Sequence, residues 1–316
     1  MKLLKLVPDN TNIDFMRWRN LALILSIIAT VASLSLVAYR GLNLGIDFVG
    51  GQQIRVTFAE RVDIEDLRGK IAGLEVGDAN IQEFGDSRSY QIRLPRPDGP
   101  ESAANQVVTK IRTFLPTAYP GVEIGAAESV SGKVSEELAT DGALSITFAM
   151  IGIALYIWLR FEWQFGVGAL LTLFHDVSMT LGFFSLTQLP VDLNVVAAIL
   201  TIVGYSLNDT VVIYDRIREN LRKFRKMGIV PLLNLSLNET LSRTIVTSLS
   251  ILLALGALMV FGPDVIFGLT VAIFLGIFVG TYSSIYISSP VLVWLGVQPD
   301  SFLRQDDPDQ PEPRAA

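Results

Sequence analysis

The residues best placed to do chemistry are charged groups inside apolar sequence. Asp209, next to Asn208, is the only charged residue of the stretch 195–214. A carboxylate at membrane depth costs about 2.5–3.5 kcal/mol on insertion scales, so a functional role is the first interpretation. A structural hydrogen bond or ion pair inside a helical bundle is the alternative. Helical spacing puts a partly polar, partly small set of residues on the side of Asp209: Ala198, Ile202, Tyr205, Ser206, Val212 and Ile213.

Arg243 is a second charge of this kind. It lies near the start of the next apolar stretch, 237–261, and only a short segment joins the two stretches. Neighbouring helices would then hold Asp209 and Arg243 at similar depth. In a low dielectric an Asp–Arg pair satisfies both groups, and protonation of Asp209 would release Arg243 and change the packing. The alternative for Arg243 is a side chain that extends to the membrane surface.

His175 and Asp176 form a third polar feature, and His175 is the only histidine in the chain. By residue count the pair lies well inside the apolar stretch 165–187. It could belong to an ion path, together with Asn208, or line a water-filled cavity. An interhelical hydrogen bond, or a helix that starts later and puts the pair near the interface, is the alternative, and the sequence leaves this choice open.

No arrangement in the sequence suggests catalysis. It contains no nucleophile–base pair, metal-spaced cluster or phosphate-binding loop, so no enzyme activity, catalytic residue, metal or cofactor is predicted. Cysteine is absent, which excludes disulfides but selects no compartment. The net charge of −6 says little about nucleic acid, because the basic residues follow the membrane topology, and no nucleic-acid partner is expected.

Composition identifies the class of protein. Half of the 316 residues are hydrophobic, and the mean hydropathy is +0.45. Apolar runs of about 18 residues or more predict a polytopic α-helical membrane protein. Six transmembrane helices are expected, at residues 21–39, 138–159, 165–187, 195–214, 237–261 and 265–295, the last broken or ended near Pro290. The other segments are a polar lead 1–20, an insert 40–137, a basic loop 215–236, and a Pro- and Asp-rich tail 296–316 that is expected to be disordered.

The insert between the first and second helices predicts a separate α+β domain. Its patterns follow the order β-α-β-β-α-β, which is the ferredoxin-like arrangement. The expected elements are a strand at 53–58, a helix at 62–74, strands at 79–84 and 89–94, a helix at 101–115 stopped by Pro116, and a strand at 121–129. We interpret this insert as a packed interaction domain, because nothing in it resembles an active site.

A glycine-rich motif precedes this domain. Gly45, Gly50 and Gly51 flank a single carboxylate, Asp47. Such a composition at the exit of a helix is typical of a tight turn that starts a strand. Asp47 is therefore expected to be a turn or cap residue, and the motif as a whole is expected to be structural.

Basic residues set the expected orientation. They are concentrated in the lead and in the loop after the fourth helix, and they are absent from residues 187–194 and 262–264. Under the positive-inside rule, both termini then face the cytoplasm and the α+β domain is extracytoplasmic.

Two motifs resemble the signatures of the SecF family of protein-export membrane subunits. Gly45-Ile-Asp-Phe-Val-Gly-Gly51 resembles the first signature, and Val203–Asn220 resembles the second and more specific one. The Phe of the first motif and the small external domain favour SecF over its sister SecD. The resemblance implies one six-helix half of a twelve-helix member of the resistance–nodulation–division superfamily, with SecD as the other half. Further matching segments are His175–Val177 and Asn238–Thr244, within a similarity from Leu21 to about Leu295.

The resemblance also implies a function. SecF-family proteins work with SecD beside the SecYEG channel in the bacterial cytoplasmic (inner) membrane. There the proton or sodium motive force assists preprotein translocation after the ATP-driven SecA step. Asp209 matches the family's ion-coupling Asp, and Arg243 matches its partner Arg. Two alternatives are a proton-coupled small-molecule or lipid exporter half of the same superfamily, and an assembly factor that does not transport.

Overall fold

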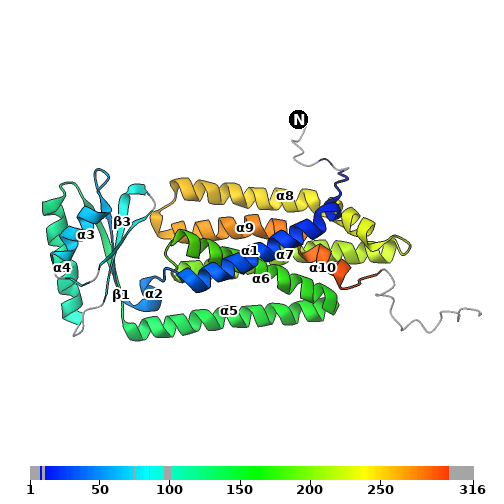
Figure 1. Ribbon diagram of the computed structural model, residues 1–316, viewed down its shortest axis with the longest axis horizontal. Helices are drawn as coiled ribbons and strands as arrows, with labels where there is room; N and C mark the ends of the chain where they lie inside the picture. The colour runs from blue at the N-terminus through cyan, green and yellow to red at the C-terminus, as the bar shows by residue number, and fades with distance from the viewer. Residues whose placement is uncertain are drawn as a thin grey trace, which may run out of the picture.

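The molecule consists of a small α+β domain at one end of a helical bundle (Figure 1). The computed structural model describes residues 8, 11–74, 76–77, 79–84, 86–95 and 101–298. The start of the first spanning helix, drawn in dark blue, lies at the opposite end of the bundle from the domain. We call these two ends the far end and the domain end. Most of the tail that was predicted to be disordered, from residue 299 onward, lies outside the described residues.

Within the described residues, six helical segments are long and apolar enough to span a membrane. Their bounds are Phe15–Arg40, Gly132–Arg160, Trp163–Thr187, Leu193–Lys223, Ile229–Phe261 and Phe267–Trp294. The middle four are the single helices α5, α6, α7 and α8 in this order. The first segment joins η1 (Phe15–Trp18) to α1 (Arg19–Arg40), and the last joins α9 (Phe267–Tyr286) to α10 (Ser288–Trp294). The prediction of a polytopic α-helical membrane protein with six spanning helices is confirmed.

The prediction of a basic loop at residues 215–236 is wrong, because most of these residues are helical. Helix α7 continues to Lys223 and α8 begins at Ile229, which leaves only a short turn between them. Asn220 Nδ2 on α7 donates to Ser236 Oγ (2.9 Å) and Glu239 Oε2 (2.7 Å) on α8, so the two helices stay paired beyond the apolar stretch. Hydropathy marks the part of a helix that suits the membrane, whereas the helix itself ends where its backbone bonding ends.

The last spanning segment breaks at Ile287, near Pro290 as predicted. Ile287 has a φ of −117° and separates α9 from α10. Pro290 is the third residue of α10, where the missing backbone N–H would have no partner inside the helix. Pro290 therefore lies within the first turn of α10 and does not break the helix.

The α+β domain has the predicted ferredoxin-like order. Its elements are β1 (Gly51–Thr57), α3 (Ile64–Ala72), β2 (Asn80–Phe84), β3 (Asp86–Leu94), α4 (Glu101–Ala118) and β4 (Glu123–Val130). The sheet order is β2-β3-β1-β4, and all pairs are antiparallel. The prediction that the second domain helix stops at Pro116 is wrong, because α4 continues to Ala118. Thr117 Oγ1 donates to Thr113 O (3.2 Å) and Tyr119 N to Leu115 O (2.8 Å), so the last turn keeps its other bonds.

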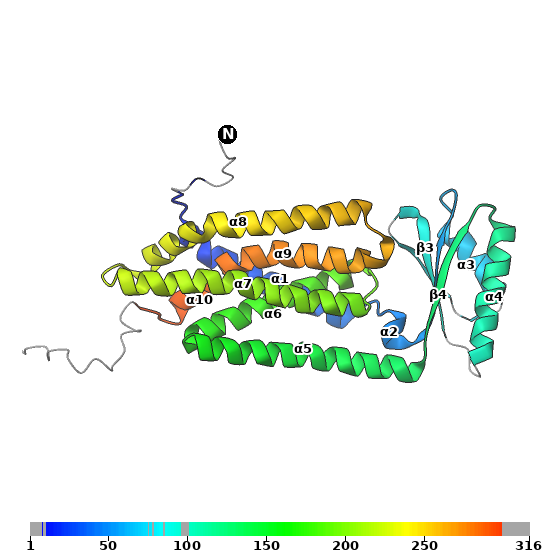
Figure 2. The same ribbon diagram turned by 180° about the vertical axis from the view of Figure 1, so that it is seen from behind.

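The two faces of the sheet differ in character. Ile54 and Ile92 are fully buried in a cluster that includes Leu67 of α3 and Leu115 of α4. Both domain helices lie on the side of the sheet turned away from the bundle (Figures 1 and 2). Side chains alternate along a strand, so the intervening polar residues face the bundle. These residues are Gln53, Arg55, Gln91 and Arg93.

Helices α7 and α9 pack tightly in the bundle, whereas α5 and α8 lie at its edges (Figure 2). A Cβ atom on Gly276 of α9 would lie 2.3 Å from Ile202 Cγ1 of α7. One turn further along α9, a Cβ atom on Gly280 would lie 3.3 Å from Ser206 Cβ. Small residues of this kind let helix backbones approach closely inside a membrane.

Candidate functional site

Asp209 lies on the face of α7 that is turned into the bundle. Its side chain is 4% exposed. Its Oδ2 atom is buried and has no hydrogen-bond partner among the described residues. Leaving a buried polar atom unpaired carries the full desolvation cost, so this carboxylate can be satisfied by a proton, a cation or a donor from another chain. The residues predicted to share its face include four that are buried: Ala198, Ile202, Ser206 and Ile213.

Arg243 of α8 does not contact Asp209, which corrects the expected direct pair. Its side chain is exposed, and no ion pair joins it to Asp209 within the described chain. The positive charge of Arg243 still acts on the Asp209 carboxylate through space. The two helices are neighbours as predicted, but Asp209 is turned inward and Arg243 outward. Asn208, the neighbour of Asp209, is also exposed.

Asp176 is the most completely satisfied carboxylate in the bundle. It is fully buried, and its Oδ1 atom lies 2.9 Å from His175 Nδ1. Its Oδ2 atom accepts hydrogen bonds from Ser206 Oγ of α7 (2.6 Å) and Ser283 Oγ of α9 (2.9 Å). Asp176 therefore joins three helices. The alternative that α6 starts late is wrong, because α6 begins at Trp163 and the pair lies midway along it.

Hydroxyl groups extend this polar region along the contact between α7 and α9. Thr210, which follows Asp209, pairs with Ser284 through their hydroxyls (3.0 Å). Thr281 Oγ1 donates to Ser248 Oγ of α8 (2.8 Å). The sequence analysis missed the residues that α9 contributes. The cluster Thr281-Tyr-Ser-Ser284 inside an otherwise apolar helix is the signal that could have identified them.

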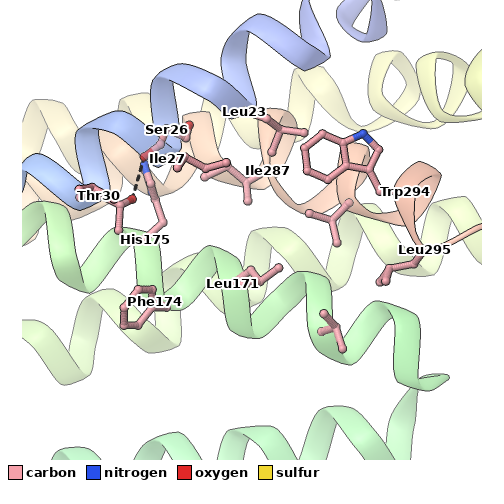
Figure 3. A pocket seen from close by; sticks show the side chains of 13 residues that line it. Leu23, Ser26, Ile27, Thr30, Leu171, Phe174, His175, Ile287, Trp294 and Leu295 are labelled. Atoms are coloured by element: carbon pink, nitrogen blue, oxygen red, sulfur yellow. Dashed lines mark hydrogen bonds between the residues drawn. The ribbon is translucent and has the colours of Figure 1, made fainter.

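His175 also faces a cavity at the surface of the bundle. A cavity of about 340 Å³ lies between α1, α6 and α10, and its lining is almost entirely apolar. Figure 3 shows His175 beside Ser26 and Thr30 of α1, with Phe174 on the same helix as His175 and Trp294 on α10. His175 thus lies between this cavity and the Asp176 hydrogen bonds.

The glycine-rich motif holds the start of α7. Gly45 leads into the short helix α2 (Ile46–Val49), and Gly50 and Gly51 have φ values of +72° and +118°, which favour glycine. Asp47 Oδ2 accepts a hydrogen bond from the backbone N–H of Leu193 (3.0 Å), the first residue of α7. Asp47 is thus a capping residue for a helix that starts 146 residues later in the chain.

Arg93 of β3 binds the domain to the segment between α1 and α2. Its guanidinium donates to Asn43 Oδ1 and to the backbone carbonyl of Leu44, both at 2.9 Å. Asn43 Nδ2 in turn donates to the carbonyl of Gln188 (2.6 Å), between α6 and α7. Burial lowers the pKa of Arg93, and the charge of Asp192 opposes this shift. The sequence analysis did not identify Arg93, because a single Arg in a strand carries no sign of its partners.

Replacing Asp47 tests its capping role. We expect Asp47→Ala to destabilise the start of α7 by about 1 kcal/mol, the usual contribution of a capping side chain. The amide of Leu193 should then exchange with solvent roughly fivefold faster in a hydrogen–deuterium exchange measurement. Asp47→Asn keeps an acceptor oxygen and should exchange at a rate close to that of wild type.

Asp63→Ala is the matched control. Asp63 caps α3 inside the domain by accepting from the amides of Glu65 (2.8 Å) and Asp66 (3.2 Å). This change should speed exchange at those two amides and leave Leu193 unaffected. An unchanged rate at Leu193 in Asp47→Ala would show that the observed contact does not hold α7.

Fold and site together define a class: a polytopic α-helical membrane protein with a ferredoxin-like domain after its first spanning helix and carboxylates buried between its helices. The family described as protein export membrane protein SecD/SecF, C-terminal, matches residues 110–298, and the SecD/SecF GG motif matches residues 40–60. The protein translocase subunit SecF of Cereibacter sphaeroides is 43% identical over 300 residues, which cover 93% of each chain. The chain belongs to the SecF family of protein translocase subunits.

Two further proteins match most of this chain, one by sequence and one by structure. SecF of Pseudomonas aeruginosa is 42% identical over 293 residues, covering 92% of this chain and 94% of its own. The crystal structure of SecDF from Thermus thermophilus, described as a translocon-associated membrane protein, superimposes with a TM-score of 0.84 at 33% identity. That match covers 91% of this chain but only 39% of the SecDF chain.

Proposed function

We propose that this chain is an accessory subunit of the Sec protein-export translocase. Together with SecD, it uses the proton or sodium motive force to assist preprotein translocation across the bacterial cytoplasmic membrane, after the ATP-driven SecA step. The observation that carries this proposal is Asp209, a membrane-embedded carboxylate with an unpaired buried oxygen and the charge of Arg243 acting on it. The names of its relatives support the export role.

The energetics suit an auxiliary role. One elementary charge crossing the membrane releases about 2.3 kcal/mol per 100 mV, which is enough to bias a conformational cycle more than tenfold. Asp209 lies near the middle of α7, whose start is held by Asp47 and connected to the domain through Asn43 and Arg93. If a change in the charge of Asp209 moves α7, these contacts of Asp47, Asn43 and Arg93 would therefore transmit the movement to the domain.

An exposed polar surface supports SecD as the partner. Asn208 of α7 and Arg243, Thr247 and Ser250 of α8 are exposed on helices that can span a membrane. Polar groups facing lipid are costly, whereas a second helical half packed on this surface would satisfy them. In the SecDF structure the matching region is 39% of a longer chain, which is consistent with such a second half. SecYEG and the preprotein are the further partners of this proposal.

The distribution of basic residues supports an orientation of the chain in the membrane. The far end carries Arg216, Arg218, Arg222 and Lys223 on α7, and the turn after it carries more basic residues. The positive-inside rule places this end and both termini in the cytoplasm and the ferredoxin-like domain outside it. The small-molecule exporter remains a weaker candidate, because the relatives found are named translocase subunits.

The proposal is tested with preprotein translocation into vesicles that contain this chain, SecD and the channel. We expect an imposed ion gradient to raise the yield of translocated preprotein, and an ionophore to remove that gain. Vesicles without this chain should show no such gain. A yield that is indifferent to the gradient in the complete system would contradict an ion-driven role.

Arg243→Ala should remove most of the gradient-dependent gain, because the carboxylate of Asp209 loses the cation that acts on it. The matched control is Arg225→Ala, which removes the same charge from the turn after α7. Normal gradient dependence in Arg243→Ala would instead favour a side chain that merely extends toward the membrane surface.

A further inference from the structure

A basic pocket at the far end of the bundle plays no part in the proposed ion coupling. It has a volume of about 530 Å³. Arg160, the last residue of α5, forms one wall. The other lining residues recur every three or four positions, so they form one face of the end of α7. These residues are Asp215, Arg218, Glu219, Arg222 and Lys223.

Two cations in this pocket are left without an ion pair. Arg160 pairs with Asp215 at 2.9 Å, and Arg218 pairs with Glu162 at 3.2 Å. Arg222 and Lys223 are exposed, and neither forms an ion pair with any residue that the structure describes. The pocket thus presents positive charge to an incoming group, although the Lys223 ammonium also lies over the Phe224 ring (5.1 Å) and acts on Glu239.

The paired arginines form a defined wall. The guanidinium groups of Arg160 and Arg218 both lie over the ring of Phe161, at 4.9 and 5.2 Å from its centre. Arg218 also donates to the backbone carbonyl of Arg160 (3.3 Å), and Phe161 itself is buried. Side chains held in this way lose little freedom when a ligand binds, so the site is partly preorganised.

The surroundings indicate where the ligand would come from. Trp158 and Leu159 precede Arg160 and are 70% and 88% exposed, and Trp163 at the start of α6 is 57% exposed. Exposed Trp residues at the ends of spanning helices are typical of the membrane–water interface. Arg160 lies between two such helices, so the pocket opens at the level of lipid head groups.

We propose that this pocket binds the phosphate head group of an anionic phospholipid, with Arg222 and Lys223 as its charged contacts and its acyl chains against the Trp158–Leu159 surface. Guanidinium and ammonium groups are the usual partners of phosphate oxygens. Basic pockets between helices on the cytoplasmic side are recognised head-group sites, and each Lys or Arg near the membrane surface adds to the attraction for anionic lipid.

The test is a lipid titration of the purified full-length chain in detergent, followed by native mass spectrometry. Phosphatidylglycerol should bind in a discrete stoichiometry. Arg222→Gln with Lys223→Gln should weaken this binding by about twenty-fivefold, since each basic contact contributes roughly fivefold. Phosphatidylcholine, which has the phosphate but no net charge, should bind at least tenfold more weakly to wild type.

Arg225→Gln with Lys226→Gln is the matched control, because it removes the same two charges from the adjacent turn outside the pocket. This variant should keep its affinity for phosphatidylglycerol. Equal losses in both double variants, or no loss in the first, would overturn the proposal. So would inorganic phosphate that displaces the lipid at equal concentration, because the site would then bind a free anion. None of these outcomes depends on gradient-driven export.

Discussion

Asp209→Asn is expected to abolish the gradient-dependent part of preprotein translocation and to leave the gradient-independent part at the wild-type level. Asn has nearly the same shape as Asp and can form hydrogen bonds, but it cannot exchange a charge. The bias that one charge supplies, about 2.3 kcal/mol per 100 mV, is then lost. The measurement is the vesicle assay with and without an imposed gradient, in the presence of SecD and the channel.

Asp141→Asn is the control for this change. Asp141 belongs to another helix that can span the membrane, α5, but its side chain is exposed rather than buried between helices. This variant should retain the full response to the gradient. Equal translocation by wild type and Asp209→Asn under a gradient would make Asp209 a structural residue and would leave the chain as a scaffold.

Gly276→Ala is expected to destabilise the bundle by roughly 1–3 kcal/mol, the usual cost of inserting a methyl group into a packed interior. The new Cβ atom would lie 2.3 Å from Ile202 Cγ1, far inside van der Waals contact. Ile202 is β-branched and has one strongly preferred rotamer in a helix, so it cannot easily move aside. Helix α7 must then shift away from α9, and Asp209 shifts with it.

Gly256→Ala provides the matched comparison. Gly256 lies on α8, and a Cβ atom added there meets no atom within 4 Å. The same methyl group should therefore leave stability unchanged or raise it slightly, since Ala favours helices more than Gly does. The measurement is the unfolding temperature of both variants in the same detergent. Equal temperatures for Gly276→Ala and wild type would show that α7 and α9 tolerate a wider separation.

Much of the architecture could be predicted from the sequence, because it depends on local patterns. Six apolar runs were enough to identify six spanning helices, since a helix in a membrane must satisfy its own backbone. Alternating and helical periodicities within residues 40–137 were enough to predict the ferredoxin-like order. The ends of elements were less predictable: α7 continues past its apolar part to Lys223, and α4 continues through Pro116.

The candidate site depended on tertiary structure to a greater degree. The amino-acid sequence by itself determined that Asp209, Asp176 and Arg243 are charges within membrane-spanning segments. Only the tertiary structure decided that Arg243 points outward, and that Asp47 caps a helix distant in the chain. Only the tertiary structure also decided that Asp176 is satisfied by hydroxyls of two other helices, Ser206 and Ser283. The physical reason is that hydropathy and periodicity act over a few residues, whereas a side chain's partners depend on how distant helices rotate and pack against one another.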